Sequence, residues 1–392
     1  MIRVGFVIED NGWLGGLNYF RNLFNAIYKM PDRKIEIVIF TGRNTNIELF
    51  RDFPPVEIVN TSYLDRFHPM WVLHKVGYHF FLNDFFFERL LKEYQIDLLS
   101  HSDYLSATSS IATLGWIPDF QCIHFPDFFT GGGVCSHEKR LLLNSKLCSA
   151  IVLSSYDAQK DMQQFSPQFV HKSKVLQFVV DPPFSADEPT IKDLEKKYEI
   201  NGSYFYVPNQ FWRHKNHRIL IDGLKILKDR NCLVTVVMTG KTIDGRQPGY
   251  FEQLMQYAKD QDVLDVFRVL GVVPYSDVVA FIKNSVAVMN PSLFEGWHTA
   301  VEEAKSLGKR VILSDIPVHR EQNPTEGIYF DPQNPVALAD AMQKVWMDSE
   351  CISHNRLVMR AREELDTRQY KFAKNYETIV LDVIDQHMRT AK

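Results

Sequence analysis

The sequence lacks the features of a disulfide-stabilised, membrane-spanning or nucleic-acid-binding protein. Its five cysteines are scattered, and no two have the C-x-x-C spacing of redox or zinc sites. No run of about eighteen apolar residues occurs, so no segment is predicted to span a membrane. Lys and Arg total 44 against 48 Asp and Glu, which leaves no overall positive field to attract nucleic acid. We therefore expect a cytoplasmic protein with reduced thiols and no nucleic-acid partner.

Two familiar phosphate-binding motifs are also missing. Gly15 and Gly16 follow a predicted strand and precede apolar residues with helical spacing, but they match neither G-x-G-x-x-G nor the lysine-containing P-loop. Paired glycines let a backbone approach a ligand closely, and a simple tight turn explains them equally well.

The single D-x-D string, residues 260–262, falls between a predicted helix and a predicted strand. We therefore predict no metal ion and no cofactor.

The sequence does contain a regular alternation of apolar strands and amphipathic helices, which is typical of parallel, doubly wound α/β sheets. In the first half, strands are predicted at residues 2–8, 35–41, 98–100, 112–117, 150–154 and 175–179. In the second half, they are predicted at residues 204–207, 233–239, 267–274, 286–289, 310–313 and 327–330. A polar, proline-containing break separates the halves, so we place one domain at residues 1–183 and another at 200–367. Residues 366–388 read as a long amphipathic helix.

The most informative segment is residues 291–308, which reads as a loop that leads into a helix. The apolar run at 286–289 stops just before a proline, and apolar residues with helical spacing begin near Thr299. Thr299 and Glu302 have the spacing of a capping box, and Gly308 stands where helices commonly end. We therefore predict a helix that starts at Thr299 and ends before Gly308.

Two carboxylates flank this predicted helix start, Glu295 before it and Glu303 about one turn inside it. The unpaired N–H groups at a helix start attract phosphate, and carboxylates accept hydrogen bonds from sugar hydroxyls. The combination predicts a nucleotide-sugar site. Acids near a helix start also stabilise the helix without any ligand, which is the alternative explanation.

A second segment whose side chains could bind a ligand follows the predicted strand at 204–207. Residues 213–217 contain an arginine, a lysine and two histidines beside a predicted helix start. Such a group favours an anion, and a solvated basic turn is the alternative. His124 lies between prolines in a loop after another predicted strand, where ligands of such sheets bind. His101 is interpreted as structural.

The E-x7-E spacing of Glu295 and Glu303, with the glycine–lysine–arginine run 308–310 after it, resembles the signature of family 4 retaining glycosyltransferases. That resemblance implies the GT-B fold, in which two Rossmann-like domains face a central cleft and the C-terminal helix, here about 368–392, crosses back onto the first domain. It implies that Glu303 holds the donor ribose. It also implies that the donor sugar is held by Glu295 and by the loop residues Gly296, Trp297, His298 and Thr299.

The resemblance assigns further roles by position. Lys215 corresponds to the lysine that neutralises the leaving diphosphate, whereas Gln210 stands where the family usually has an arginine, so Arg213 is the expected substitute. The turn at Val272 and Val273 is expected to contact the base through its backbone. Two parts of the first domain are expected to meet the donor. These are the glycine pair Gly15 and Gly16, which would face the phosphates, and His124, which would approach the sugar.

The sequence therefore predicts a metal-independent, retaining glycosyltransferase. Its donor would be a nucleotide sugar, with UDP and GDP both open, and its acceptor a glycan or lipid-linked glycan in cell-surface polysaccharide or lipopolysaccharide synthesis. A nucleotide-sugar 2-epimerase, an inverting GT-B enzyme and a non-enzymatic binding module are the alternatives. The oligomeric state is left open.

One aromatic-rich segment, residues 71–91, has two interpretations. It reads as a single amphipathic helix that packs into the core, or as a patch that faces an acceptor or a membrane surface. In the second case the protein would sit peripherally at the inner face of the plasma membrane.

Overall fold

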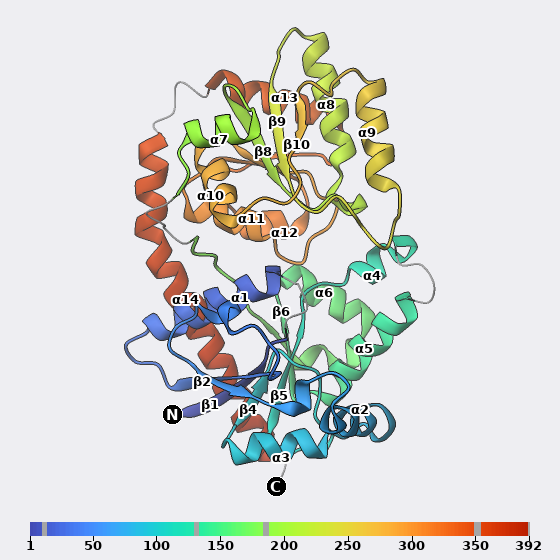
Figure 1. Ribbon diagram of the computed structural model, residues 1–392, viewed down its shortest axis with the longest axis vertical. Coiled ribbons are helices and arrows are strands. Elements are labelled where there is room, and N and C mark those ends of the chain that lie inside the picture. The colour runs from blue at the N-terminus through green and yellow to red at the C-terminus, as the bar shows by residue number, and fades with distance from the viewer. Residues whose placement is uncertain (10–13, 129–132, 183–187, 349–353, 391–392) are drawn as a thin grey trace. The chain divides into compact units, whose positions relative to one another are not determined.

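The computed structural model describes residues 1–9, 14–128, 133–182, 188–348 and 354–390. Its chain divides into two compact units (Figure 1). The first contains Met1–His124, Gly132–Val179 and Thr367–Lys392, and the second contains Phe125–Gly131 and Val180–Asp366. Each unit is built around one parallel sheet.

The sheet of the first unit has seven parallel strands in the order β3-β2-β1-β4-β5-β6-β7. The strands are β1 Ile2–Val7, β2 Ile35–Thr41, β3 Glu57–Asn60, β4 Leu98–Ser100, β5 Ala112–Ile117, β6 Ala150–Leu153 and β7 Ser173–Val175. The strand order changes direction between β1 and β4, which is the pattern of a doubly wound sheet. The predicted sheet type is confirmed.

Helices cover both faces of this sheet. They are α1 Leu14–Lys29, α2 Pro69–Phe81, α3 Phe85–Glu93, α4 Gln121–His124, α5 Gly133–Leu147 and α6 Tyr156–Phe165, together with the end of α14 His354–Thr390. Phe6 of β1 packs against Phe24 of α1 and Tyr376 of α14, with ring centroids 4.7 and 6.2 Å away. Phe40 of β2 packs against Phe87 of α3, 6.0 Å away. Phe6 is paired with Ile39 and Val7 with Phe40, so the two clusters lie on opposite faces.

Two strand predictions for this unit were wrong. The strand expected at 175–179 ends at Val175, because the chain makes one further hydrogen bond, from Leu176 to Leu153, and then leaves the sheet edge. Strand β3 was not predicted. It is short, and only Val59 of its four residues is buried, so its sequence carries no clear alternating pattern.

The segment expected as one helix over 71–91 is two helices, α2 and α3. Leu82 between them has a left-handed backbone, φ 49°, and the N–H groups of Leu82 and Asn83 both bond to the carbonyl of Gly77, which ends α2. The Asp84 carboxylate then accepts from the Phe87 N–H and begins α3. The helix stops here because a left-handed C-cap is followed, after one intervening residue, by the N-cap of the next helix.

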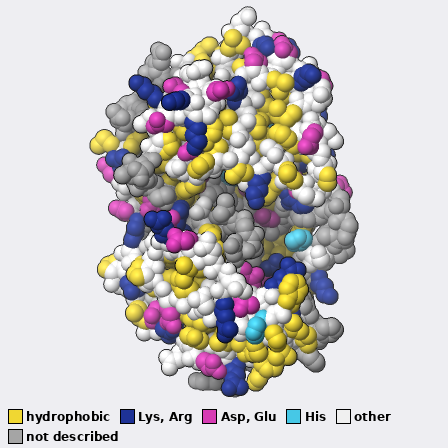
Figure 2. All heavy atoms as spheres, viewed as in Figure 1, with side chains coloured by type: hydrophobic (Ala, Val, Ile, Leu, Met, Phe, Trp, Pro, Cys, Tyr) yellow, Lys and Arg dark blue, Asp and Glu magenta, His cyan; other side chains and the backbone are white. Residues whose placement is uncertain are grey.

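The break leaves a group of large apolar side chains in contact with solvent, which we call the α2–α3 apolar face. Its members are at least 37% exposed and comprise Phe67, Val72, Leu73, Val76, Leu82, Phe85 and Phe86. Figure 2 shows hydrophobic side chains gathered over α2. Phe87 and Leu91 on the other side of α3 are buried, so the core-packing interpretation holds for that side only. Among the described residues, no helix is both long and apolar enough to cross a membrane.

The second unit contains a six-stranded parallel sheet in the order β10-β9-β8-β11-β12-β13. Its strands are β8 Tyr204–Pro208, β9 Thr235–Thr239, β10 Phe267–Val269, β11 Val288–Asn290, β12 Val311–Ser314 and β13 Ile328–Phe330. All six lie within or next to the predicted ranges. Its helices are α7 Ile191–Tyr198, α8 His217–Asp229, α9 Tyr250–Asp260, α10 Tyr275–Asn284, α11 Thr299–Ser306, α12 Pro317–Gln322 and α13 Pro335–Met347.

Two separate apolar cores sandwich this second sheet. One contains Val207 and Met238 with Leu220 of α8 and Leu338 of α13. The other is formed by alternate residues of the same strands, with side chains from α10 and α11, and includes Tyr206, Val237, Leu313, Phe281 and Val301. Strand residues that alternate between two cores are those of a sheet buried on both faces. Because both faces are covered, a ligand site is expected in the loops at the carboxyl ends of the strands.

The last helix, α14, belongs to the second unit up to Asp366 and to the first from Thr367 onward. In the first unit, the Tyr376 hydroxyl donates to Ser100 Oγ at 2.8 Å. Glu377 accepts from the Lys34 backbone N–H at 2.5 Å. The return of the C-terminal helix to the first unit is the connection that the fold resemblance implies.

We predict that Tyr376→Phe lowers the free energy of unfolding by about 1 kcal/mol, because it removes one buried hydrogen bond and leaves Ser100 without that donor. Chemical denaturation of the wild type and the variant measures the change. Tyr370→Phe on the same helix is the matched control, since Tyr370 is 46% exposed. Equal losses in the two variants would show that the Ser100 contact does not stabilise the fold.

Candidate active site

The segment predicted to organise the site lies at the carboxyl end of β11. The strand ends at Asn290, the loop 291–298 follows, and α11 begins at Thr299, as predicted. Gly308 has φ +65°, and a Cβ atom there would lie 2.5 Å from the Leu357 carbonyl oxygen. Only glycine fits both the backbone conformation and the space, which ends the helix where the sequence indicated.

The predicted capping box at this helix start is wrong. The N-cap residue is His298 and not Thr299, and its side chain makes no capping hydrogen bond. Glu302 is 1% exposed and accepts from Lys305 Nζ at 3.0 Å and from Gln322 Nε2 at 3.1 Å. Because Gln322 comes from α12, a tertiary contact takes the carboxylate that local spacing assigned to the cap.

The structure brings together two candidate residues that are far apart in the sequence, Lys215 and Glu295. Lys215 Nζ lies 2.6 Å from Glu295 Oε1, and the two side chains are 10% and 8% exposed. Lys215 ends the short helical turn Arg213–Lys215 after β8, and Glu295 lies in the loop after β11. These strands are neighbours in the sheet, and the Leu293 N–H donates to the His214 carbonyl at 2.8 Å, which joins the two loops.

Glu295 is ionised in this setting. Burial opposes its ionisation, but the positive charge of Lys215 and the hydrogen bond that Lys215 donates outweigh burial and hold the pKa of Glu295 well below its usual range. The site therefore contains a buried, charge-paired carboxylate. A buried ion pair of this kind is costly to break by removing one partner.

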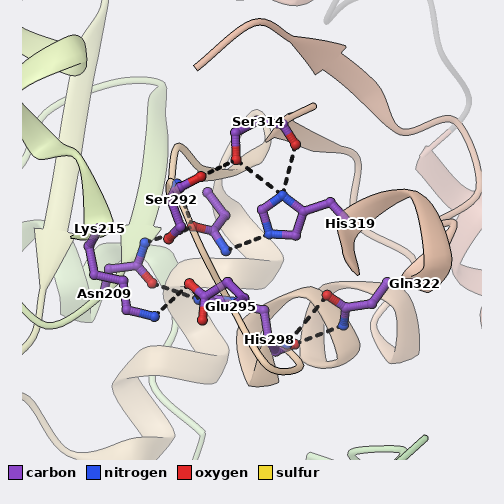
Figure 3. Close-up of polar contacts among 9 residues, drawn as sticks. Asn209, Lys215, Ser292, Glu295, His298, Ser314, His319 and Gln322 are labelled. Carbon is purple, nitrogen blue, oxygen red and sulfur yellow. Dashed lines mark hydrogen bonds and ion pairs between the residues drawn. The ribbon is translucent and has the colours of Figure 1, made fainter. Parts of the chain in front are cut away.

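A chain of buried hydrogen bonds supports the Glu295 loop (Figure 3). Asn209 Nδ2 donates to Asn290 Oδ1 at 3.1 Å, and the same oxygen accepts from the Ser292 hydroxyl at 2.6 Å. Asn209 Oδ1 therefore faces His298 Nε2, 2.9 Å away. Since an amide oxygen only accepts, this contact makes Nε2 the protonated nitrogen of His298. That N–H also lies 3.5 Å from Glu295 Oε1.

His319 anchors the other end of the same chain. Its Nε2 faces Asn290 Nδ2 at 3.1 Å and so acts as an acceptor, and its Nδ1 donates to the Ser314 carbonyl at 2.9 Å. The Ser314 hydroxyl donates to the Ser292 carbonyl at 2.5 Å. Residues after β8, β11 and β12 are thus joined in one network with consistent donors and acceptors. Asn209, Asn290 and His319 were not predicted from the sequence, although Asn209 directly follows β8 and Asn290 ends β11, positions where ligands of such sheets bind.

Glu303, the second acid of the signature, lies on the buried side of α11 and is 4% exposed. It accepts from the Tyr275 hydroxyl at 2.7 Å. The structure therefore places Glu295 and Glu303 at two ends of one loop-and-helix segment, each with its own hydrogen-bond donor. Tyr275 was not predicted from the sequence.

The other candidates of the second unit lie around this segment. Gln210 Oε1 accepts from the Lys241 backbone N–H at 2.8 Å. The guanidinium of Arg213, an exposed residue, lies 5.2 Å from the ring centre of Phe128. Val272 is 66% exposed, and Val273, next to it, precedes α10. Gly296, Trp297 and His298 form the end of the loop before Thr299. The roles of all these residues toward a donor stay predictions.

The first unit holds the remaining candidates. Gly15 and Gly16 lie in the first turn of α1, not in a loop before it as expected, and residues 10–13 lie outside the described part of the chain. His124 ends α4, and its Nε2 lies 2.8 Å from Asp161 Oδ1. That hydrogen bond raises the pKa of His124. His101 is half-buried between the Tyr19 hydroxyl and the Ser100 hydroxyl, each 2.8 Å away.

Four buried histidines of the second unit are neutral. Burial lowers the pKa of His214, His217 and His298 to about 3 and that of His319 to about 4. In the unfolded chain a histidine has a pKa of about 6.5, so the unfolded state binds more protons than the folded state below that pH. Their contribution to stability is complete above about pH 6.5 and is lost as the pH falls toward 4.

We predict that the free energy of unfolding decreases between about pH 6.5 and pH 4, with each histidine contributing up to about 1.4 kcal/mol per pH unit. Urea unfolding at a series of pH values measures the slope. His217→Phe should reduce it, because His217 stacks on Phe211 with ring centroids 4.3 Å apart and its ring nitrogens have no partner among the described residues. An unchanged slope in this variant would contradict the prediction.

Comparison with known proteins identifies the segment that carries this site. Residues 190–364 match the family model described as Glycosyl transferases group 1. An O-antigen chain mannosyltransferase, RfbU, of Salmonella typhimurium is 27% identical over 168 residues, which are 43% of this chain and 45% of that protein. That match therefore spans less than half of the relative.

A second relative aligns over nearly the whole chain. It is the N,N'-diacetylbacillosaminyl-diphospho-undecaprenol alpha-1,3-N-acetylgalactosaminyltransferase of Campylobacter jejuni, 21% identical over 97% of this chain and 100% of that protein.

Solved structures agree on the fold. Anabaena Alr3699/HepE in complex with UDP and glucose superposes with a TM-score of 0.68 at 16% identity, covering 97% of this chain and all of that one. WaaG, a glycosyltransferase involved in lipopolysaccharide biosynthesis, superposes with a TM-score of 0.58 at 14% identity, covering 96% of this chain and 99% of that one. The chain therefore has the GT-B fold, and its residues 190–364, with Lys215, Glu295 and Glu303 among them, match the family model of the group 1 glycosyl transferases.

Proposed function

We propose that the protein is a retaining glycosyltransferase that moves a sugar from a nucleotide-sugar donor to a glycan or lipid-linked glycan. The observation that carries the proposal is the buried Lys215–Glu295 pair in the loops beside the start of α11, within the segment that matches the family model. It combines a cation for a diphosphate with a carboxylate for sugar hydroxyls. Retention of configuration follows from the E-x7-E resemblance.

Glycosyl transfer requires mainly that the departing diphosphate be stabilised. Lys215 and the N–H groups at the start of α11 supply positive charge at a fixed place, so little reorganisation is needed when negative charge develops on the leaving group. Glu295 would accept hydroxyl hydrogen bonds from the sugar and hold it in position for transfer. His124 and Arg213 are the further residues proposed to act on the donor.

Lys215 has three N–H donors, of which the Glu295 contact uses one. When a diphosphate binds, Lys215 can therefore donate a second N–H to it. The His298 N–H, 3.5 Å from Glu295, is positioned to donate to the carboxylate. This arrangement keeps Glu295 ionised in both states. It accounts for the buried network of asparagines and histidines behind the loop.

The relatives support a lipid-linked acceptor in cell-surface polysaccharide synthesis. The Campylobacter protein is named for transfer to a diphospho-undecaprenol-linked sugar, and the Salmonella protein for the O-antigen chain. An acceptor with a lipid tail lies at a membrane surface. We therefore propose that this protein works at the cytoplasmic face of the membrane, as a peripheral protein.

The α2–α3 apolar face is the surface proposed to meet the membrane. Residues 66–83 contain no Asp or Glu, so no acid within this stretch opposes an anionic surface. Two cations lie among its aromatic rings: the Arg66 guanidinium is 4.8 Å from the ring centre of Phe67, and Lys75 Nζ is 6.0 Å from that of Trp71. Apolar side chains with cations beside them are the composition of interfacial membrane helices.

We predict that Lys215→Ala lowers kcat by about a hundredfold or more, the scale of losing one preorganised charge contact. Turnover is measured as release of nucleoside diphosphate from the donor that most raises the melting temperature in a panel of nucleotide sugars. Lys225→Ala on exposed α8 surface is the control and should leave kcat unchanged.

The double variant Lys215→Met with Glu295→Gln separates chemistry from stability. It removes both buried charges, so the melting temperature should recover relative to Lys215→Ala while turnover stays low. Recovery of turnover along with stability would refute the proposed role of Lys215. Formation of an altered nucleotide sugar without any acceptor would identify an epimerase instead.

For the membrane contact, we predict that Leu73→Glu with Val76→Glu reduces sedimentation with vesicles of anionic phosphatidylglycerol by more than about tenfold, because two apolar side chains lose their burial. Ile243→Glu is the control, since Ile243 is 83% exposed but lies in the second unit. Wild-type binding should be weaker to neutral phosphatidylcholine vesicles. Equal binding of the face variant and the wild type would exclude this surface.

A further inference from the structure

Resting on the proposed function, we infer that Tyr275 is a positioning residue of the donor site, which orients the Glu303 carboxylate toward the hydroxyls of a nucleotide ribose. Tyr275 is the first residue of α10, and Glu303 lies on α11. The two residues are separated by 28 positions in the sequence, and the Tyr275 hydroxyl donates to Glu303 Oε1 at 2.7 Å.

The position of Tyr275 is set by the packing of α10 on the sheet and by the contact of its own side chain with the same core. α10 packs against β8 through Phe281, whose ring stacks on Tyr206 with centroids 5.2 Å apart. α11 packs on the same face through Val301, which belongs to the same core. Because both helices are fixed on one sheet face, the hydroxyl and the carboxylate they carry are held at a constant separation.

The hydrogen bond restricts how the Glu303 carboxylate can rotate. Glu303 is buried, and a bond from a neutral hydroxyl to a charged oxygen is stronger than one between neutral groups. A carboxylate can accept several hydrogen bonds, so the Tyr275 bond does not prevent Glu303 from binding a ribose. It reduces the freedom that binding would otherwise remove, and preorganisation of this kind increases affinity.

Tyr275 also connects two parts of the predicted nucleoside site. Only Pro274 separates it from the turn at Val272 and Val273, where the backbone is expected to contact the base. A residue next to that turn is therefore hydrogen-bonded to the acid expected to hold the ribose. A group that acts on the nucleoside stabilises the ground state and the transition state equally, so its loss should raise the donor KM and leave kcat nearly unchanged.

The test compares wild type, Tyr275→Phe and Tyr198→Phe by isothermal titration with UDP, 2′-deoxy-UDP, GDP and 2′-deoxy-GDP. Tyr198 is the matched control, because its hydroxyl donates to Asp277 on the same helix α10 without touching Glu303. For the ribonucleotide that binds, Tyr275→Phe should raise Kd about tenfold, the scale of one lost hydrogen bond to a charged group. The preference for ribose over deoxyribose should decrease in the same variant, while kcat changes less than about twofold.

The outcomes separate this inference from the proposed function. If the wild type binds UDP or GDP and Tyr275→Phe binds it with the same Kd and the same ribose preference, the inference is wrong and the proposed function stands. An equal loss in Tyr198→Phe would assign the effect to general destabilisation of α10 and would also overturn it. If the wild type binds none of the four nucleotides, both the inference and the proposed function fail.

Discussion

The ion pair between Lys215 and Glu295 is the interaction on which the rest of the site depends. Both side chains are almost fully buried, and a buried charge is tolerated only when it is paired and hydrogen-bonded. The protein meets this condition with two neighbouring loops held together by a backbone bond and with a second layer of asparagine, serine and histidine side chains. A charged pair kept away from water interacts strongly with neighbouring groups, because electrostatic interactions are stronger where water is excluded, and this property suits the proposed role toward a diphosphate and a sugar.

The histidines of this second layer are neutral, so they do not compete with Lys215 for the Glu295 carboxylate. If His214 or His298 were protonated, its positive charge would add to that of Lys215 and compete for the single carboxylate. Burial prevents this by keeping the pKa of each near 3. The imidazoles can then serve as directional hydrogen-bond partners. His319 accepts from Asn290 and donates to Ser314, and His298 donates to Asn209. The geometry of the Glu295 loop thus depends on the protonation state of residues that need not touch a ligand.

The two parallel sheets explain why residues from distant parts of the chain meet. In a parallel sheet all carboxyl ends lie on one edge, so the loops after β8, β11 and β12 converge there. Lys215, Glu295 and His319 come from those three loops or from the helices that follow them. The same logic places Tyr275 and Glu303 on neighbouring helices over one sheet face. Solved structures with the same fold at 14–16% identity indicate that this scaffold tolerates wide sequence change, which is expected when apolar strand residues set the fold and loop residues set the site.

Local sequence patterns were sufficient to predict part of this structure. Apolar runs located nearly all strands, and the E-x7-E spacing with Gly308 located α11, because strand and helix periodicity are written in neighbouring residues. Tertiary contacts decided the rest. Glu302 binds Gln322 instead of capping its helix, Leu82 and Asp84 divide a segment that reads as one helix, and Tyr275 reaches Glu303 across 28 positions. The sequence by itself determined the two doubly wound sheets and the candidate acids. Only the tertiary structure decided which cation, which histidines and which tyrosine meet those acids, because such contacts depend on how the loops and helices pack on the sheet.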